Sequence, residues 1–290
     1  MRIPRFWVKA TYSAPSGEGQ GLRFQAWGWS HESLAAAETA GKSRALQLAD
    51  RFRRGGDRQA KAEYDYLDQP LREEIVEEVG PAGDSFAVIT RNRYGSLILN
   101  ASSVLFADVD FPSPKAHGFV DSLLMSFSQA RHAERIEETQ QATLAFVKSW
   151  INKHPERSVR LYRTAAGLRL LFTDKAYDPV SGESRELLQE LGSDPLYIRL
   201  TMKQESFRAR LTPKPWRCGA PAYPVRFPLQ NERDVEAARA WKEQYAKIAA
   251  GYRVCDLISV SGREPADPAT KGVVDLHDRY ACNPRVGKLA

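Results

Sequence analysis

Val104-Leu105-Phe106-Ala107-Asp108-Val109-Asp110-Phe111 is the stretch that decides the fold, because an apolar run of strand length ends in two carboxylates. Pro112 follows directly and is expected to end the strand, since proline cannot donate to the ladder of a strand interior. Side chains alternate along a strand, so Asp108 and Asp110 point to the same face of the sheet. We therefore expect a buried strand that presents an acidic pair at its end.

The segments that follow this strand predict a regular order of further elements. They are a helix over 121–153, a strand over 159–163, a strand over 168–173, a helix over 184–191 and a strand over 196–202. This order is the split βαβ pattern, an α+β arrangement with one antiparallel or mixed sheet and two helices on one face. The first and third strands are central neighbours in that pattern, which places Arg169 beside Asp108 and Asp110.

The rest of the chain is expected to pack on this core as one compact unit. Residues 1–100 form an N-terminal α+β region, residues 101–217 the core, and residues 218–290 a C-terminal region of helix and loop. The further elements expected from periodicity and caps are strands over 6–12, 22–29, 85–90 and 94–100, and helices over 30–52, 71–79 and 234–249, with a short helix near His277.

The acidic pair carries the strongest chemical signal in the sequence. Two carboxylates on one face repel each other unless a cation or a proton compensates. Hard ions such as Mg²⁺ or Mn²⁺ bind through one or two carboxylates together with substrate phosphates, so Asp108 and Asp110 are candidate metal ligands and catalytic residues. A salt bridge to Arg169 explains the pair equally well without metal. On the metal hypothesis, replacing either aspartate by alanine leaves the fold intact.

Arginines near this strand are candidate phosphate ligands. Arg163 and Arg169 flank the turn between the strands over 159–163 and 168–173, and Arg91 lies in a polar turn between two earlier strands. The planar fork of arginine binds phosphate or carboxylate through two hydrogen bonds, so these side chains suit a triphosphate as well as the aspartates.

A basic segment, residues 207–217, alternates cations with aromatic residues and prolines. Such a segment suits a strand or loop that follows a nucleic-acid backbone and stacks a base, although a charged edge strand has the same pattern. The candidate nucleic-acid ligands are Arg208, Arg210, Lys214, Trp216 and Arg217.

Composition excludes some classes without naming a function. The net charge of +6 and a pI near 9.2 suit an anionic partner. The sequence has no apolar run of membrane-spanning length and no secretory signal, so we expect a cytoplasmic protein without membrane association. Cys218, Cys255 and Cys282 show no zinc spacing and are expected to be reduced thiols, and His277-Asp278 is interpreted as structural.

The arrangement resembles the catalytic core of the archaeo-eukaryotic primase (primase-polymerase) superfamily, and the whole chain resembles a family of bacterial proteins. Phe106-Ala107-Asp108-Val109-Asp110 matches the superfamily's acidic motif, and Gly167-Leu168-Arg169 stands where it has Gly-x-His. The resemblance implies an RRM-like core over 101–217. A third acidic residue on a later strand is expected, for which Asp194, Glu205 and Asp256 are candidates.

Three functions remain open at this point. The first is a primase-polymerase-like protein that binds a nucleotide or single-stranded nucleic acid and, if active, acts as a Mg²⁺- or Mn²⁺-dependent nucleotidyltransferase. The second is a catalytically inactive module that binds nucleic acid or a protein partner, with Asp108 and Asp110 neutralised by Arg169. The third is a sugar-nucleotide transferase, since such enzymes also place Asp-x-Asp after an apolar strand.

Overall fold

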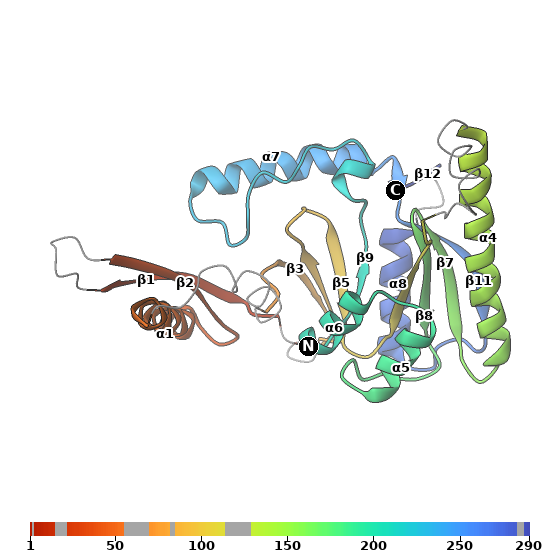
Figure 1. Ribbon diagram of the computed structural model, residues 1–290, viewed down its shortest axis with the longest axis horizontal. Coiled ribbons are helices and arrows are strands. Elements are labelled where there is room, and N and C mark those ends of the chain that lie inside the picture. The colour runs from red at the N-terminus through yellow and green to blue at the C-terminus, as the bar shows by residue number, and fades with distance from the viewer. Residues whose placement is uncertain (2, 15–21, 55–69, 82–84, 114–128, 283–286) are drawn as a thin grey trace.

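The computed structural model describes residues 1, 3–14, 22–54, 70–81, 85–113, 129–282 and 287–290 (Figure 1). This part of the chain holds two four-stranded antiparallel sheets and two smaller strand pairs, which confirms the α+β class. The strands are β1 (Phe6–Ala14), β2 (Leu22–Ser30), β3 (Glu74–Val79), β4 (Ala87–Arg91), β5 (Leu97–Ala101), β6 (Phe106–Asp110), β7 (Val159–Thr164), β8 (Gly167–Phe172), β9 (Phe207–Arg210), β10 (Tyr252–Arg253), β11 (Cys255–Ser261) and β12 (Lys288–Leu289). The helices are α1 (Leu34–Arg53), α4 (Gln129–Lys153), α5 (Gly182–Glu190), α6 (Pro195–Gln204), α7 (Glu232–Ala249) and α8 (Pro268–Ala281), with a 3-10 turn over Pro215–Arg217.

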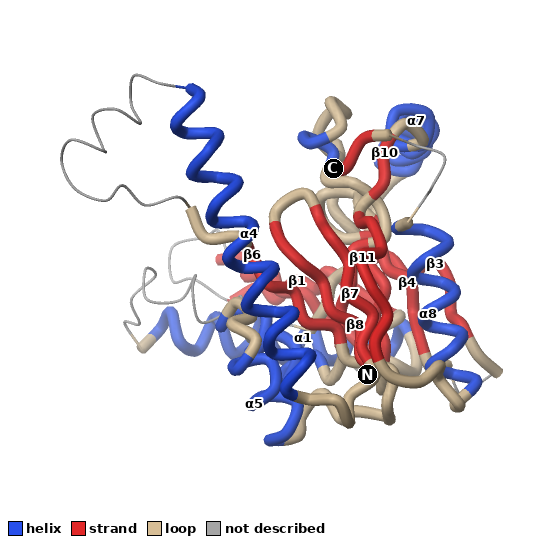
Figure 2. The backbone as a smooth tube through the Cα atoms, turned by 90° about the vertical axis from the view of Figure 1, so that its right-hand side faces the viewer, coloured by secondary structure: helices blue, strands red, loops and turns tan. Residues whose placement is uncertain are grey.

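The sheet that carries the acidic pair has the strand order β11-β7-β8-β6. Its β6 and β8 are antiparallel neighbours, with Asp108 opposite Arg169 and Asp110 opposite Gly167, so the predicted pairing of these strands is confirmed. Helix α4 covers one face of the sheet and α8 the other (Figure 2). On the first face Trp150 of α4 packs its ring against Phe172, and on the second His277 of α8 packs against Phe106.

The second sheet has the order β3-β4-β5-β9 and meets the first across α8 (Figure 1). Residues of both sheets, such as Ile89, Leu99 and Phe106, belong to one continuous hydrophobic core. At the junction the hydroxyl of Tyr197 in α6 donates to the backbone oxygen of Phe106, at 2.8 Å. The same hydroxyl also contacts the backbone oxygen of Arg208, so β9, which carries Arg208 and Arg210, lies close to β6.

The N-terminal hairpin β1–β2 carries α1 on one face and extends away from the main body (Figure 1). Small residues allow the close contact of helix and hairpin: a Cβ on Gly28 would lie only 2.3 Å from the backbone nitrogen of Gly41. The helix begins after Ser33, whose side chain accepts from the backbone nitrogen of Ala36, so it starts later than the predicted helix over 30–52.

The strand predicted over 196–202 is wrong, because this segment is helix α6. Asp194 caps the helix by accepting from the backbone nitrogen of Leu196. Pro195 occupies the first turn, where a backbone N–H would have no partner within the helix, so the N–H that proline lacks is not needed. The apolar residues alternate in sequence, but Ile198 and Thr201 also share one face at helical spacing and are buried. The start signal Asp-Pro therefore outweighs the alternation.

The predicted helix over 71–79 is also wrong, because Glu74–Val79 is strand β3, paired with β4. Its charged residues suit the exposed edge of a sheet, where ladder pairing outweighs helix propensity.

Strand β11, the fourth strand of the first sheet, was not predicted. Helices α7 and α8 lie where the sequence placed helices, whereas positions 121–128 of the long predicted helix lie outside the described residues. None of the helices in the ranges described is both long and apolar enough to cross a membrane.

Candidate functional site

Asp108 and Arg169 form a closed ion pair on the α8 face of the first sheet. Arg169 donates from Nε to Oδ1 of Asp108 at 2.8 Å and from Nη2 to Oδ2 at 3.1 Å. Burial alone would lower the pKa of Arg169, but the carboxylate of Asp108 raises it above its ordinary value. The third nitrogen, Nη1, donates to the backbone oxygen of Arg210 at 3.0 Å. The guanidinium thus connects β8 to β6 and β9.

Gly167 allows the strands to meet this closely at the acidic end. A Cβ at Gly167 would lie 2.2 Å from the backbone oxygen of Val109 and 2.9 Å from the Cα of Asp110. Asp110 is exposed as a residue, but the protein around its carboxyl partly shields that group from water. Its pKa is raised, first by this desolvation and then by the charges of Asp108 and Asp194. Lys214 and Arg217 act in the opposite direction.

This geometry does not fit a Mg²⁺ or Mn²⁺ site made of two carboxylates. Both oxygens of Asp108 accept hydrogen bonds from Arg169, so the arginine supplies the cation that the acidic pair requires. Asp110 remains as a single carboxylate, and its pKa is raised from the ordinary value. The acidic pair is therefore closed by Arg169 on the side of Asp108.

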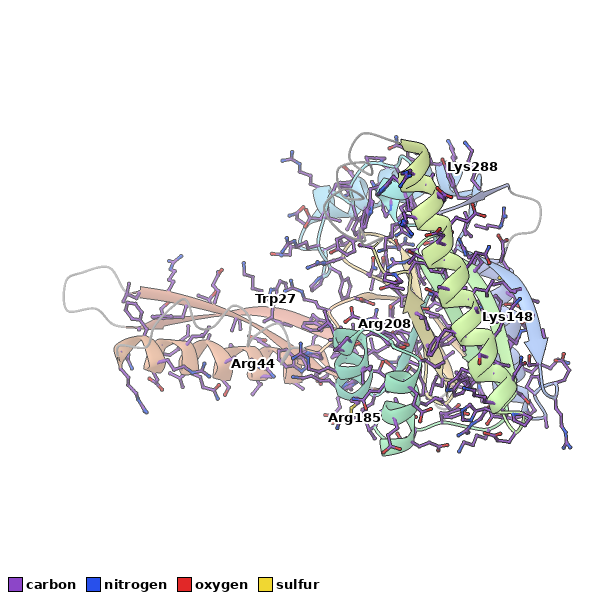
Figure 3. The ribbon with its side chains drawn as sticks, turned by 45° about the vertical axis from the view of Figure 1, so that its right-hand side comes forward. Trp27, Arg44, Lys148, Arg185, Arg208 and Lys288 are labelled. Atoms are coloured by element: carbon purple, nitrogen blue, oxygen red, sulfur yellow. The ribbon has the colours of Figure 1, made fainter. Side chains whose placement is uncertain are left out.

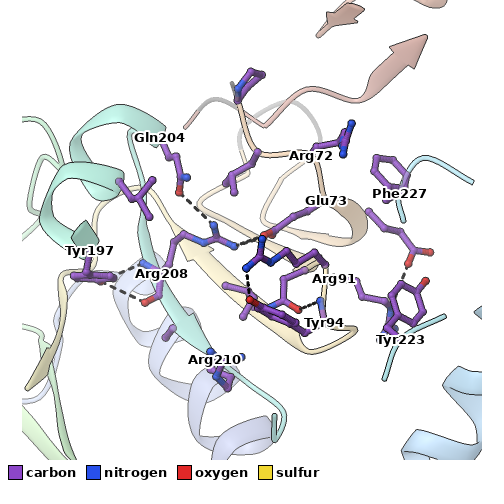
Figure 4. Close-up of a pocket in the computed structure, with 18 of the residues that line it drawn as sticks. Arg72, Glu73, Arg91, Tyr94, Tyr197, Gln204, Arg208, Arg210, Tyr223 and Phe227 are labelled. Atoms are coloured by element: carbon purple, nitrogen blue, oxygen red, sulfur yellow. Dashed lines mark hydrogen bonds and ion pairs between the residues drawn. The ribbon is translucent and has the colours of Figure 1, made fainter. Parts of the chain in front are cut away.

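A cavity of about 520 Å³ opens beside Asp108, between β9, α6 and the loop before β3 (Figure 4). We call it the arginine pocket, because its lining includes six arginines against three acidic residues. The arginines are Arg72, Arg91, Arg93, Arg208, Arg210 and Arg226. A cavity of this size is typical of small-molecule and cofactor sites and can hold about one nucleotide.

Two of the predicted arginines lie in this pocket but are held by acidic neighbours. Arg208 donates from Nη2 to both oxygens of Glu73, at 2.8 and 2.7 Å (Figure 4). Arg91 donates to Glu74 at 3.2 Å and to the backbone oxygen of Gly95 at 2.8 Å. Since Asp108 is held by Arg169, each acidic residue of the lining is already paired.

Arg210 differs from these two arginines, because its Nη1 is buried without a hydrogen-bond partner among the described residues. Its pKa is lowered to about 10, mainly by burial and then by the charge of Arg169. Arg72 and Arg226, on the other wall, repel each other, and neither forms an ion pair in the part of the chain that the structure describes. The pocket therefore holds positive charge that its own acids do not balance.

Lys214, Trp216 and Arg217 continue the cationic surface beyond the pocket. Burial and the charges of Arg210 and Arg217 lower the pKa of Lys214, while Asp110 and Asp108 oppose this effect. The ring of Trp216 is 57% exposed and packs edge-on against Tyr94 of the pocket lining, with ring centroids 5.2 Å apart. The structure thus brings together Asp108, Asp110 and most of the predicted basic segment.

Arg163 lies apart from this group, against the prediction that it shares a ligand with Arg169. It donates to Oε1 of Gln140 in α4 at 2.5 Å, and its guanidinium lies 4.3 Å from the ring centroid of Phe111. Residues 163 and 169 occupy opposite faces of the sheet, because Arg169 lies opposite Tyr162 in the register and shares its face. Strand alternation together with the register of this hairpin could have excluded Arg163.

None of the three candidate acids for a third motif lies on a strand beside the acidic pair. Asp194 is the N-cap of α6 and acts on Asp110 only through its charge. Glu205 adopts a left-handed conformation at the end of α6. Asp256 lies on β11, at the opposite edge of the sheet, and is held by Arg253.

A buried polar network behind Arg169 was missed by the sequence analysis. Nη1 of Arg169 lies 3.4 Å from Nε2 of His277, whose Nδ1 lies 2.9 Å from Oδ1 of Asp278. The Asp278 side chain thus folds back towards the imidazole of the residue before it. Tyr162 donates to the same carboxylate at 2.7 Å. His277 is fully buried. Its Nε2 lies next to Sγ of Cys255, which in turn lies next to Sγ of Cys282.

No local pattern in the sequence points to Arg72 and Arg226, the other residues that were missed. Arg72 and Arg226 are separated by more than 150 positions and meet only through the fold.

No protein-family model, curated protein or solved structure matches the chain. The function must therefore be argued from the site itself.

Proposed function

We propose that this protein binds single-stranded nucleic acid, with a backbone phosphate in the arginine pocket and a base on the exposed aromatic pair Tyr94 and Trp216. The observation that carries the proposal is Arg210, whose Nη1 is buried without a partner beside Lys214 and Arg217. A buried donor without an acceptor costs about 1–3 kcal/mol, more for a charged group. A phosphate oxygen would supply the missing acceptor.

The charge of the pocket supports an anionic ligand. Arg72 and Arg226 repel each other, and Arg210 is close to the charges of Arg169 and Arg217. Like charges placed together are destabilising unless an anion neutralises them. Arginine is well suited to phosphate, because its planar fork donates two parallel hydrogen bonds.

The aromatic pair at the rim supports a ligand that also carries a base. Tyr94 is 38% exposed and Trp216 57% exposed, so each ring offers surface to a ligand. Arg93 lies 4.6 Å from the ring centroid of Tyr94, and Lys214 lies 5.6 Å from that of Trp216. Exposed aromatic rings among cations are typical of sites that stack bases of single strands.

Binding is favoured over nucleotidyl transfer, because Arg169 occupies both oxygens of Asp108. A relation to the primase-polymerase core is part of the proposal: β6, β8 and β7 lie in the order of the first, third and second strands of the split βαβ pattern. The fourth strand, β11, lies beside β7 instead of β6. The proposal is therefore a nucleic-acid-binding relative without a two-carboxylate metal site.

Fluorescence anisotropy with a labelled single-stranded oligonucleotide tests this function. We expect the wild type to bind at low salt, and Arg210→Gln to weaken binding about tenfold or more, the loss of one charge-assisted hydrogen bond. Arg185→Gln, an exposed arginine of α5 outside the pocket, is the matched control (Figure 3). Unchanged binding by Arg210→Gln, or no binding at low salt, contradicts the proposal. Competition by duplex DNA or by ATP distinguishes a single-strand site from a duplex or free-nucleotide site.

A further inference from the structure

Cys255, His277 and Cys282 form a compact group of soft ligand atoms at the C-terminal end of α8. The two Sγ atoms lie 3.3 Å apart, and Sγ of Cys255 lies 3.8 Å from Nε2 of His277. All three ligand atoms lie within 4.8 Å of one another. We propose that this group, which we call the Cys–His–Cys cluster, binds one zinc ion.

The distances agree with the size of a zinc site. Zinc binds sulfur at about 2.3 Å and nitrogen at about 2.0–2.1 Å in a tetrahedron, which separates neighbouring ligand atoms by about 3.5–3.8 Å. The distances of 3.3 and 3.8 Å in the cluster are close to this range. A disulfide is a different arrangement, because its sulfur atoms lie about 2.05 Å apart. The thiols of Cys255 and Cys282 are thus placed as separate ligands.

The chemistry of the donors favours zinc over the hard ions. Thiolate and imidazole together select Zn²⁺ or other soft metals, whereas Mg²⁺ and Mn²⁺ prefer oxygen. Asp278 holds Nδ1 of His277 at 2.9 Å, which leaves Nε2 directed towards the cysteines. A carboxylate behind the imidazole is the usual support of a zinc-bound histidine, because it fixes the ring and makes it more basic.

Arg169 is the cation nearest to His277, since its Nη1 lies 3.4 Å from Nε2 of that residue. Arg253 interacts with the charge of Cys282, but it is itself held by Asp256. Two thiolates cancel the charge of Zn²⁺, so the loaded cluster adds no net charge beside the guanidinium. The same Nη1 also donates to the backbone oxygen of Arg210 at 3.0 Å, so it keeps an acceptor when the imidazole turns to the metal. Cys255 and His277 are fully buried, and the half-buried Cys282 gives the ion access.

The ion would join β11 to α8 next to the hydrogen bond that the backbone nitrogen of Val254 donates to the backbone oxygen of Ala281, at 2.9 Å. Cys255 begins β11 at one edge of the first sheet, whereas His277 and Cys282 belong to the end of α8. Three protein ligands leave one position of the tetrahedron for water. The test of this site is a metal titration without nucleic acid, so it is separate from the test of the arginine pocket.

Cobalt and zinc titration of the reduced, chelator-treated full chain tests the site. We expect one Co²⁺ per chain, with the near-ultraviolet band of thiolate–cobalt charge transfer and the strong visible bands of tetrahedral cobalt, both lost when zinc is added. Cys255→Ser and Cys282→Ser should abolish the charge-transfer band or reduce it severalfold. Cys218→Ser is the matched control, because Cys218 is a buried thiol outside the cluster. Its Sγ donates to the backbone oxygens of Lys214 and Pro215.

A second measurement covers variants that fail to fold. In the wild type, zinc should slow alkylation of Cys255 and Cys282 severalfold and leave that of Cys218 unchanged, as read by peptide mass. Absence of the cobalt bands in the reduced wild type overturns the proposal. So does loss of the bands in Cys218→Ser, or a Cys255–Cys282 disulfide that forms in place of metal uptake.

Discussion

Arg169 and Asp108 lie opposite each other on neighbouring strands, and the cation is the buried member of the pair. The Arg169 side chain is 4% exposed and that of Asp108 is 39% exposed. The charge of Arg169 is buried and requires the carboxylate of Asp108 to balance it, whereas water can solvate the more exposed Asp108. Asp108 is therefore first a structural partner of Arg169, and this changes what its removal should do.

Asp108→Ala should destabilise the protein by about 3 kcal/mol, because it leaves the buried charge of Arg169 without a partner. This value is at the low end for a broken buried pair, since water reaches Asp108. It reverses the expectation, drawn from the sequence, that alanine at this position leaves the fold unaffected. Urea denaturation of the two proteins measures the difference.

The neighbouring acid provides the control for that prediction. Asp110→Ala should remain within about 0.5 kcal/mol of the wild type, since Asp110 is exposed and its side chain forms no hydrogen bond with a described residue. The double variant Asp108→Ala/Arg169→Met should recover most of the loss, because it removes both charges. Equal stability of Asp108→Ala and the wild type would show that the ion pair contributes nothing.

Asp110 should make stability depend on pH. Its folded-state pKa is raised by burial and by Asp108 and Asp194, so folding favours the protonated acid. This contribution is fully present below the unfolded pKa and is lost as pH rises through the folded pKa. Asp110→Asn should therefore be more stable than the wild type at neutral pH and equally stable in acid. Thermal unfolding across a pH series tests this, and a difference that is the same at every pH contradicts it.

Gly167→Ala should destabilise the protein by about 3 kcal/mol, the upper range for overpacking. The new Cβ would lie 2.2 Å from the backbone oxygen of Val109, on the strand that is paired with the strand of Gly167. Gly182→Ala is the control, because a Cβ there meets no atom within 4 Å. It should stay within about 1 kcal/mol of the wild type. Similar denaturation midpoints for both variants would exclude a close-packing role for Gly167.

The sequence predicted the part of the site that depends on local pattern. Alternation placed Asp108 and Asp110 on one face, and the split βαβ order placed Arg169 beside them, as the register confirms. Alternation failed over 196–202, where Asp194 and Pro195 start a helix. Local signals thus decide an element correctly only when its caps and its periodicity agree.

The pocket and the cluster could not be predicted, because each depends on contacts between distant segments. Arg208 meets Glu73 across 135 positions, so its role as an ion-pair partner is invisible in the basic segment. Cys255 meets Cys282 because it begins β11, a strand that was not predicted from the sequence. The spacing of the cysteines along the chain therefore suggested no zinc site. Tertiary pairing, not residue type, decides which of these side chains remain available to a ligand.

Trp216→Ala should weaken binding of a single-stranded oligonucleotide by about 1–3 kcal/mol without changing the salt dependence, because stacking releases no counterions. The ring is 57% exposed and packs against Tyr94, so its loss should cost little stability. Phe146→Ala, a similarly exposed ring on α4, is the control and should bind as the wild type does. Anisotropy at several salt concentrations measures both effects, and a loss that grows or shrinks with salt would argue against stacking.

Lys214→Gln/Arg217→Gln should flatten the dependence of log K on log salt by about 1.4, since each phosphate contact to a single strand contributes about 0.7. Arg208→Gln should instead destabilise the fold and leave the slope unchanged, because Arg208 is held by Glu73 through two hydrogen bonds. This separates two cations of one segment that the sequence alone treats alike. Arg185→Gln, outside the segment, should change neither quantity. A slope flattened equally by Arg208→Gln would mean that Arg208 leaves Glu73 for the ligand, and an unchanged slope in the double variant would remove Lys214 and Arg217 from the interface.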